Sequence, residues 1–145
     1  MGALISSRGR YALRVMIDLA GQQGGDYVPL KDIAARQEIS QKYLEAIMSA
    51  LSKAALVEGI HGKGGGYRLC RPAEDYTLGE ILLCAEGDLS PVACLCEGSA
   101  PCSRTASCPT LPVWAELERL VTDYLQSVRL SELIPSESRA DPRGS

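Results

Sequence analysis

Three equally spaced cysteines are the residues of this 145-residue sequence best suited to chemistry. Cys96, Cys102 and Cys108 are each separated by five residues in a segment rich in Ser, Gly and Pro, with Cys94 close by. A pliable backbone lets three thiolates converge on one metal centre, and these soft ligands suit iron–sulfur clusters or zinc. Zinc fingers usually pair their ligands at shorter spacings, and the only histidine, His61, lies far away along the chain. The spacing therefore indicates a metal centre, and leaves open a zinc site completed by Cys94 or surface thiols that form an occasional disulfide.

The other two cysteines, Cys70 and Cys84, lie in apolar stretches and are expected to be small buried residues, not ligands. No apolar leader opens the chain, and apolar runs such as Ile81–Ala85 fall far short of a membrane span. We therefore expect a cytoplasmic protein with no membrane partner. In a reducing compartment, clustered thiols serve metal binding or redox chemistry more often than structural disulfides.

The first half of the sequence predicts a winged helix-turn-helix. A first helix is expected over about Ser7–Ala20, a short second helix ends near Gln37, and Ser40 is a suitable N-cap for a third. The apolar stripes of the first and third helices are Leu13, Met16, Ile17 and Ala20, and Leu44, Ile47, Met48 and Leu51. Alternating residues then flank the glycine run Gly62–Gly66, which is typical of a β-hairpin. This order predicts a mostly α fold with a small β-wing.

DNA-contacting groups are expected at the start of the third helix and in the wing. Gln41 suits an adenine edge, Lys42 a guanine edge or a phosphate, and Glu45 a cytosine. Glycines in the wing permit close backbone approach, while charged side chains supply phosphate contacts. The candidate DNA-binding residues are Arg8, Arg10, Ser40, Gln41, Lys42, Tyr43, Glu45, His61, Lys63, Gly64, Gly65 and Arg68. The alternative is a solvated polar face on a protein-interaction module.

The net charge of −3 conceals two halves of opposite sign. Residues 1–72 hold ten Lys and Arg against six Asp and Glu, a net charge of +4. Residues 73–145 hold five against twelve, a net charge of −7. Because duplex DNA repels an acidic surface, only the first half is suited to binding it.

The second half contains a short helix, a long loop, a long helix and a tail. Thr77 and Glu80 form a capping-box pattern at the short helix, and Pro112 opens a helix whose apolar stripe runs to Val128 and needs a surface to cover it. We expect a DNA-binding domain over residues 1–76, a connecting helix over 77–91, a cysteine-rich loop over 92–110, a long helix and following segment over 111–134, and a flexible tail over 135–145. No catalytic constellation is visible, so we do not expect an enzyme.

Several segments together resemble the IscR-type winged-helix iron–sulfur regulators, a family that includes the NsrR and RirA proteins. The resemblance covers about residues 4–134 and is carried by Ser6–Ala12, Val28–Ala34, Ile39–Glu45, Gly62–Tyr67 and the three spaced cysteines. It implies a bacterial homodimeric transcription factor that binds double-stranded operator DNA and senses cluster status, oxidant or nitric oxide. It also implies that Cys96, Cys102 and Cys108 hold a 2Fe–2S or 4Fe–4S cluster, and that the helix near Pro112–Val128 crosses its partner as a dimerisation helix.

The fourth cluster ligand does not follow from this resemblance. IscR proteins supply a histidine three residues after the last cysteine, where this chain has Leu111, and NsrR proteins can supply an aspartate from the first helix, where it has Arg10. Cys94, Glu97, a residue of the partner chain and an exogenous thiol all stay open as the fourth ligand.

Two DNA-contacting positions compare differently with the family pattern. His61 stands where the wing usually has an arginine, whereas Glu45 matches the base-discriminating glutamate.

Two alternative functions are an iron–sulfur redox or carrier protein that docks through its helix-turn-helix, and a zinc- or thiol-based redox regulator. The basic first half favours the DNA-binding regulator over the redox carrier, whereas the zinc- or thiol-based regulator stays open until the metal and acid-labile sulfide of the purified protein are measured.

Overall fold

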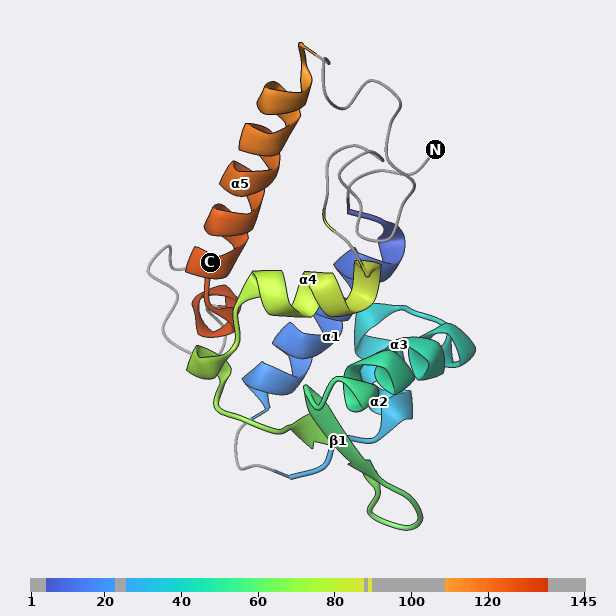
Figure 1. Ribbon diagram of the computed structural model, residues 1–145. Coiled ribbons are helices and arrows are strands. Elements are labelled where there is room, and N and C mark those ends of the chain that lie inside the picture. The colour runs from blue at the N-terminus through green and yellow to red at the C-terminus, as the bar shows by residue number, and fades with distance from the viewer. Residues whose placement is uncertain (1–4, 23–25, 88, 90–108, 136–145) are drawn as a thin grey trace.

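The computed structural model describes residues 5–22, 26–87, 89 and 109–135. The helices are α1 (Ser7–Gly21), α2 (Leu30–Gln37), α3 (Gln41–Lys53), α4 (Leu78–Glu86) and α5 (Leu111–Ser127); the strands are β1 (Val57–Ile60) and β2 (Gly66–Leu69), and short 3-10 turns are η1 (Ala73–Asp75) and η3 (Leu130–Leu133). Figure 1 shows α1–α4 gathered together, with the hairpin and α5 projecting from them in different directions. The expected mostly α fold with a small β-wing is confirmed. No helix in the described ranges is both long and apolar enough to cross a membrane.

The core lies where α1, α2, α3, β1 and α4 meet. The fully buried side chains include Val15, Met16, Ile33, Leu44, Met48, Leu51, Val57 and Ile81. The stripe predicted for the third helix is buried as expected. In α1 the most buried apolar residues are Ala12, Val15, Met16 and Leu19, whereas Leu13, Ile17 and Ala20 are only half-buried. The buried face of α1 is therefore rotated about the helix axis relative to the predicted stripe. It faces both α3 and α4, which pack on this helix.

A buried carboxylate joins α1 to α2. Asp18 is 8% exposed and accepts two hydrogen bonds from the Arg36 guanidinium, at 3.0 and 2.7 Å, and one from Gln37 Nε2 at 2.8 Å. The side chain of Arg14 in turn donates to the side-chain oxygen and the carbonyl of Gln37. Charge-assisted bidentate bonds are strong and directional, so they hold α2 in a defined orientation on α1.

The turn between α2 and α3 also follows from local chemistry. Glu38 ends α2 in the left-handed conformation, with a φ of 54°, and Ile39 N–H donates to the Ala34 carbonyl at 3.1 Å. The Ser40 hydroxyl then accepts from Tyr43 N–H at 3.2 Å and caps α3, as predicted. Helix, tight turn and capped helix together form the helix-turn-helix.

The wing is an antiparallel hairpin in which Val57 pairs with Leu69 and Ile60 with Gly66. Val28, in the α1–α2 linker, pairs with Tyr67 of β2 as an isolated antiparallel bridge, through reciprocal backbone bonds at 2.8 and 2.9 Å. Gly66 has a φ of +155°, and a Cβ there would lie 2.2 Å from the Val28 carbonyl oxygen. Only glycine fits where the linker backbone approaches this closely.

Helix α4 begins with half of the predicted capping box. The Thr77 hydroxyl accepts from Glu80 N–H at 3.1 Å. The Glu80 carboxylate instead accepts from Arg71 at 2.7 Å. This ion pair ties α4 to the segment that leaves the wing.

Helix α5 is attached to the rest of the protein at its C-terminal end (Figure 1). The Leu78 N–H donates to the Val128 carbonyl, and the Leu130 N–H to the Tyr76 carbonyl, both at 3.0 Å. None of the α5 residues is buried, and its start and end both fall one residue before the predicted limits. Its large exposed apolar side chains are Val113, Leu117, Leu120 and Tyr124.

The expectation for the two isolated cysteines was half right. Cys84 is half-buried against the core, and its thiol donates to the Ala50 carbonyl at 3.5 Å. Cys70 is exposed, contrary to expectation. It directly follows β2, whose residues Tyr67, Arg68 and Leu69 are only half-buried, so the apolar neighbours in sequence did not indicate burial.

Candidate nucleic-acid interface

The N-terminal half of α3 exposes the side chains that the sequence assigned to base contacts. Gln41, Lys42 and Glu45 are exposed, while Leu44 and Ile47, on the opposite side of the helix, are buried. The burial of one face fixes the rotation of α3 about its axis, so these three side chains point outward. A helix with exposed polar groups near its N-terminus has the form that enters a major groove.

Tyr43 is half-buried and belongs to a packing cluster. Its ring meets that of Tyr11 edge to face, with centroids 5.6 Å apart and an interplanar angle of 78°. The Arg14 guanidinium lies 5.2 Å from the Tyr11 centroid. Tyr43 therefore braces the start of α3 against α1.

Two arginines are exposed in the first turn of α1, where the helix macrodipole disfavours positive charge. Arg8 is exposed, and Arg10 donates to the Ser7 hydroxyl at 3.1 Å. The Glu86 carboxylate, at the end of α4, accepts from Ser6 N–H at 2.6 Å and from the Ser6 hydroxyl at 2.8 Å. This carboxylate places a negative charge at the N-terminus of α1, which offsets part of the repulsion.

The tip of the wing exposes two of the predicted basic side chains. His61, Lys63 and Gly64 are exposed, and Gly65 is half-buried. Arg68, the third basic candidate of the wing, is instead paired across the hairpin with Glu58 at 2.6 Å. Its guanidinium also lies over the Tyr27 ring, 4.4 Å from the centroid. The tip thus exposes His61 and Lys63, whereas the Arg68 side chain is held within the hairpin.

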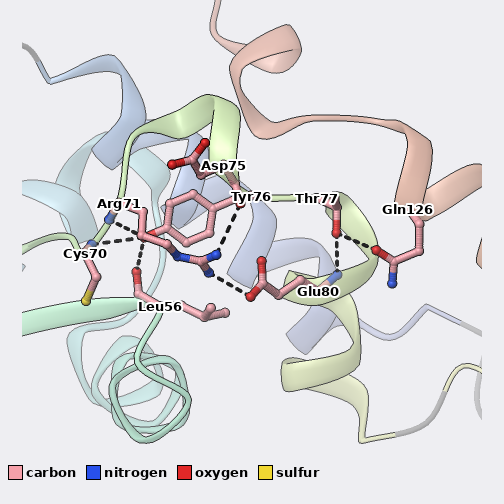
Figure 2. A network of polar contacts seen from close by, with 8 residues as sticks. All are labelled: Leu56, Cys70, Arg71, Asp75, Tyr76, Thr77, Glu80 and Gln126. Atoms are coloured by element: carbon pink, nitrogen blue, oxygen red, sulfur yellow. Dashed lines mark hydrogen bonds and ion pairs between the residues drawn. The ribbon is translucent and has the colours of Figure 1, made fainter.

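Sequence reasoning missed the polar network at the base of the wing, drawn in Figure 2. The Tyr76 hydroxyl donates to the Leu56 carbonyl at 2.7 Å and accepts from Cys70 N–H and Arg71 N–H, both at 3.0 Å. The Tyr76 side chain is fully buried. No local pattern announces these contacts, because they join residues up to twenty positions apart. Asp18 was also missed, although a lone aspartate inside an apolar helical stripe is a usable signal of a buried ion pair.

The four clustered cysteines, Cys94, Cys96, Cys102 and Cys108, lie outside the described residues. Within the described ranges, no group of three or more His, Cys, Asp or Glu side chains could hold a metal ion. Partial desolvation raises the pKa of the Cys70 thiol although the residue is exposed, and burial raises that of Cys84, so both favour the thiol over the ligating thiolate at neutral pH.

The chain is similar to known transcriptional regulators over nearly its whole length. A model of the Rrf2 family, described as an iron-dependent transcriptional regulator, matches residues 5–136. The HTH-type transcriptional regulator IscR of Vibrio vulnificus (strain YJ016) is 40% identical over 130 residues, which are 90% of this chain and 76% of the relative.

Solved structures agree with this assignment. CymR, the global cysteine regulator of B. subtilis, superposes with a TM-score of 0.72 at 36% identity, covering 90% of this chain and 95% of that one. IscR of T. potens superposes with a TM-score of 0.71 at 31% identity, covering 96% and 93%. The predicted resemblance to IscR-type regulators is confirmed. The chain belongs to the Rrf2 family of iron-dependent transcriptional regulators and is a DNA-binding regulator of transcription.

Proposed function

We propose that the protein binds duplex operator DNA as a homodimer, with α3 in the major groove and the wing tip against the flanking backbone. The observation that carries this proposal is the exposure of Gln41, Lys42 and Glu45 on a helix whose opposite face is buried. Gln41 and Glu45 have the hydrogen-bonding groups to distinguish bases, and Lys42 reaches a guanine or a phosphate. Ser40 and Tyr43 set the position of α3 within this interface.

Basic groups outside α3 would supply phosphate contacts. Arg8 and Arg10 lie in the first turn of α1, and His61 and Lys63 lie at the wing tip. Gly64 and Gly65 allow the tip backbone to approach the duplex. Phosphate contacts position a protein on DNA without reading sequence, so these groups contribute affinity and α3 contributes specificity.

The apolar face of α5 is proposed as the homodimer interface. Val113, Leu117, Leu120 and Tyr124 follow at intervals of four, three and four residues, which places them along one side of a helix. A shallow groove lined by Pro112, Val113, Glu116, Leu117 and Leu120 runs along this side. A second copy of the same helix offers a matching stripe, and an isologous two-fold contact is the commonest way to cover such a surface. The resulting dimer would present two copies of α3 to two half-sites.

An iron–sulfur cluster is proposed on Cys96, Cys102 and Cys108. The donor set fits this group, because three closely spaced thiolates are the ligands that such clusters use. When bound, the cluster would supply iron that reacts with oxidants or nitric oxide. The family description of iron dependence supports this assignment. Cys94 stays a candidate for the fourth ligand.

The proposed function is tested by fluorescence anisotropy with a labelled duplex from the region upstream of the protein's own coding sequence. We expect saturable binding that weakens steeply as salt concentration rises and that exceeds binding to a scrambled duplex of equal length. Equal affinity for the two duplexes at every salt concentration would contradict sequence-specific operator binding.

A further inference from the structure

The base of the wing is closed by a side-chain hydroxyl from outside the hairpin. Beyond the Val57–Leu69 pair, the strands make only a long backbone contact, from Cys70 N–H to the Leu56 carbonyl at 3.4 Å. The Tyr76 hydroxyl donates to that same carbonyl at 2.7 Å and accepts from the amides of Cys70 and Arg71 at 3.0 Å. One donor and two acceptor sites are all that a phenol offers, so its hydrogen-bonding capacity is fully used on the two chains that enter and leave the wing.

The surroundings of the ring keep this hydroxyl in place. Tyr76 is fully buried, and the Arg71 guanidinium covers its ring 4.3 Å from the centroid while pairing with Glu80 at 2.7 Å (Figure 2). Burial raises the pKa of Tyr76, so the phenol stays protonated and able to donate to Leu56. Removing the oxygen alone would leave the ring packed but take this acceptor away from two part-buried amides.

The backbone of the same residue is attached to the end of α5. The Tyr76 carbonyl accepts from Leu130 N–H, and Leu78 N–H donates to the Val128 carbonyl, both at 3.0 Å. Between them Thr77 pairs with Arg129 as an antiparallel bridge, and the Thr77 hydroxyl donates to Gln126 Oε1 at 2.9 Å. Residues 76–78 thus form a short strap whose backbone is joined to residues 128–130, directly after α5, and whose Tyr76 phenol binds both chains at the base of the wing.

We infer that Tyr76 is a positioning residue that fixes the wing relative to α5 and thereby sets the wing's contact with DNA. The inference rests on the proposed DNA interface and dimer. If α5 crosses its partner at the two-fold axis, the strap is the connection through which the distance between the two wing tips is defined. Loss of the phenol oxygen would loosen the wing while leaving α3, with its own buried face, in place.

The test is a double-mutant cycle between Tyr76→Phe and Lys63→Ala, measured as operator affinity of the full-length protein over a range of salt concentrations. In the wild-type background, Lys63→Ala should flatten the slope of log K against log salt by about one, the loss of one phosphate contact. Tyr76→Phe should produce a similar flattening by itself. Adding Lys63→Ala to Tyr76→Phe should then change the slope by much less than one, because the tip is no longer held against the duplex.

Ile81→Val is the matched control. Ile81 is fully buried in α4 and takes no part in the hydrogen bonds of the Tyr76 hydroxyl at the base of the wing. The substitution trims the core by one methylene, and Lys63→Ala should keep its full effect in that background. Amide exchange gives a second readout: Cys70 and Arg71 should exchange at least tenfold faster in Tyr76→Phe and not in Ile81→Val. Should Tyr76→Phe not fold, Arg71→Ala is the second variant. Arg71 is partly exposed, and its loss uncovers the Tyr76 ring. It should likewise reduce the effect of Lys63→Ala on the salt slope.

Full additivity of Tyr76→Phe and Lys63→Ala, or unchanged exchange of the two amides, would overturn the inference while operator binding stands. Failure of the wild-type protein to prefer its operator would overturn the proposed function, and the positioning role with it. The two failures are therefore distinguishable in one set of measurements.

Discussion

The carboxylate of Asp18 in α1 and the guanidinium of Arg36 in α2 form a two-point ion pair with O···N distances of 2.7 and 3.0 Å. The Asp18 side chain is 3% exposed, whereas that of Arg36 is 42% exposed. The pair is therefore buried on one side and solvated on the other. It sets the angle between α1 and α2, and through the tight turn at Glu38 it helps to set the position of α3.

The first prediction concerns this ion pair. Arg36→Ala leaves a buried carboxylate with only the Gln37 amide as a described partner, and should lower the free energy of unfolding by about 2 kcal/mol, less than for a fully buried pair because Arg36 is partly exposed. Denaturant unfolding followed by circular dichroism measures this loss. The double variant Asp18→Asn with Arg36→Ala should recover part of it, since no buried charge is left unpaired. No recovery in the double variant would contradict the role assigned to the buried charge.

The second prediction separates DNA contact from fold. Lys42→Ala should flatten the dependence of log K on log salt by about one if its ammonium meets a phosphate. Because Lys42 is exposed, the thermal unfolding midpoint of the protein should not change. Lys53→Ala is a matched control on the same helix, because Lys53 is also exposed but lies in the last turn of α3. Anisotropy titrations at four or more salt concentrations give both slopes. Equal slopes for the wild type and both variants would argue against α3 as the groove-binding helix.

The third prediction rests on two glycines of the wing. Gly66→Ala places a methyl group 2.2 Å from the Val28 carbonyl oxygen at a φ of +155°, and should destabilise the wing by about 3 kcal/mol through combined clash and strain. Gly62→Ala has a similarly unusual φ of +91° but an open site, so its loss should be about 1 kcal/mol. Unfolding and operator titrations on both variants compare the two effects. If Gly62→Ala lowers the free energy of unfolding as much as Gly66→Ala does, the backbone conformation of these glycines, and not the close approach of Val28, explains why the wing needs them.

Local signals in the sequence predicted the elements of this fold more reliably than the contacts between them. The sequence predicts Ser40 and Thr77 as caps because each hydroxyl binds the amide three residues later. It predicts the buried stripe of α3 because the spacing of the apolar residues repeats within one helix. The contacts of the Tyr76 phenol depend on distant segments meeting, which no spacing encodes. The position of Asp18 in an apolar stripe signals a buried ion pair, but nothing in the spacing identifies Arg36 as its partner. The exposure of Cys70 likewise depends on how the hairpin packs on distant helices, which its apolar neighbours in sequence do not encode.

The fourth prediction concerns the exposed face of α5. Leu120→Glu places a charge in the centre of the apolar stripe, where Leu120 is 52% exposed, and should convert the proposed dimer into a monomer and weaken operator binding at least tenfold. Thr122→Glu adds the same charge to an exposed position on the other side of the helix and should leave the dimer intact. Sedimentation analysis of both variants at micromolar concentration reports the assembly state. A dimeric Leu120→Glu variant would place the interface elsewhere.

The fifth prediction concerns the cysteines proposed as cluster ligands. Protein purified without oxygen should be brown and contain iron and acid-labile sulfide, and Cys102→Ala should lose both because two thiolates no longer enclose the cluster. Cys70→Ala is the control, since Cys70 is a cysteine exposed at the end of the wing, and its removal should leave iron and sulfide unchanged. Absorption spectra together with metal and sulfide analysis measure the result. A colourless wild-type protein that contains zinc would show that the three spaced thiolates serve a zinc site, and retention of iron and sulfide in Cys102→Ala would remove that residue from the ligand set.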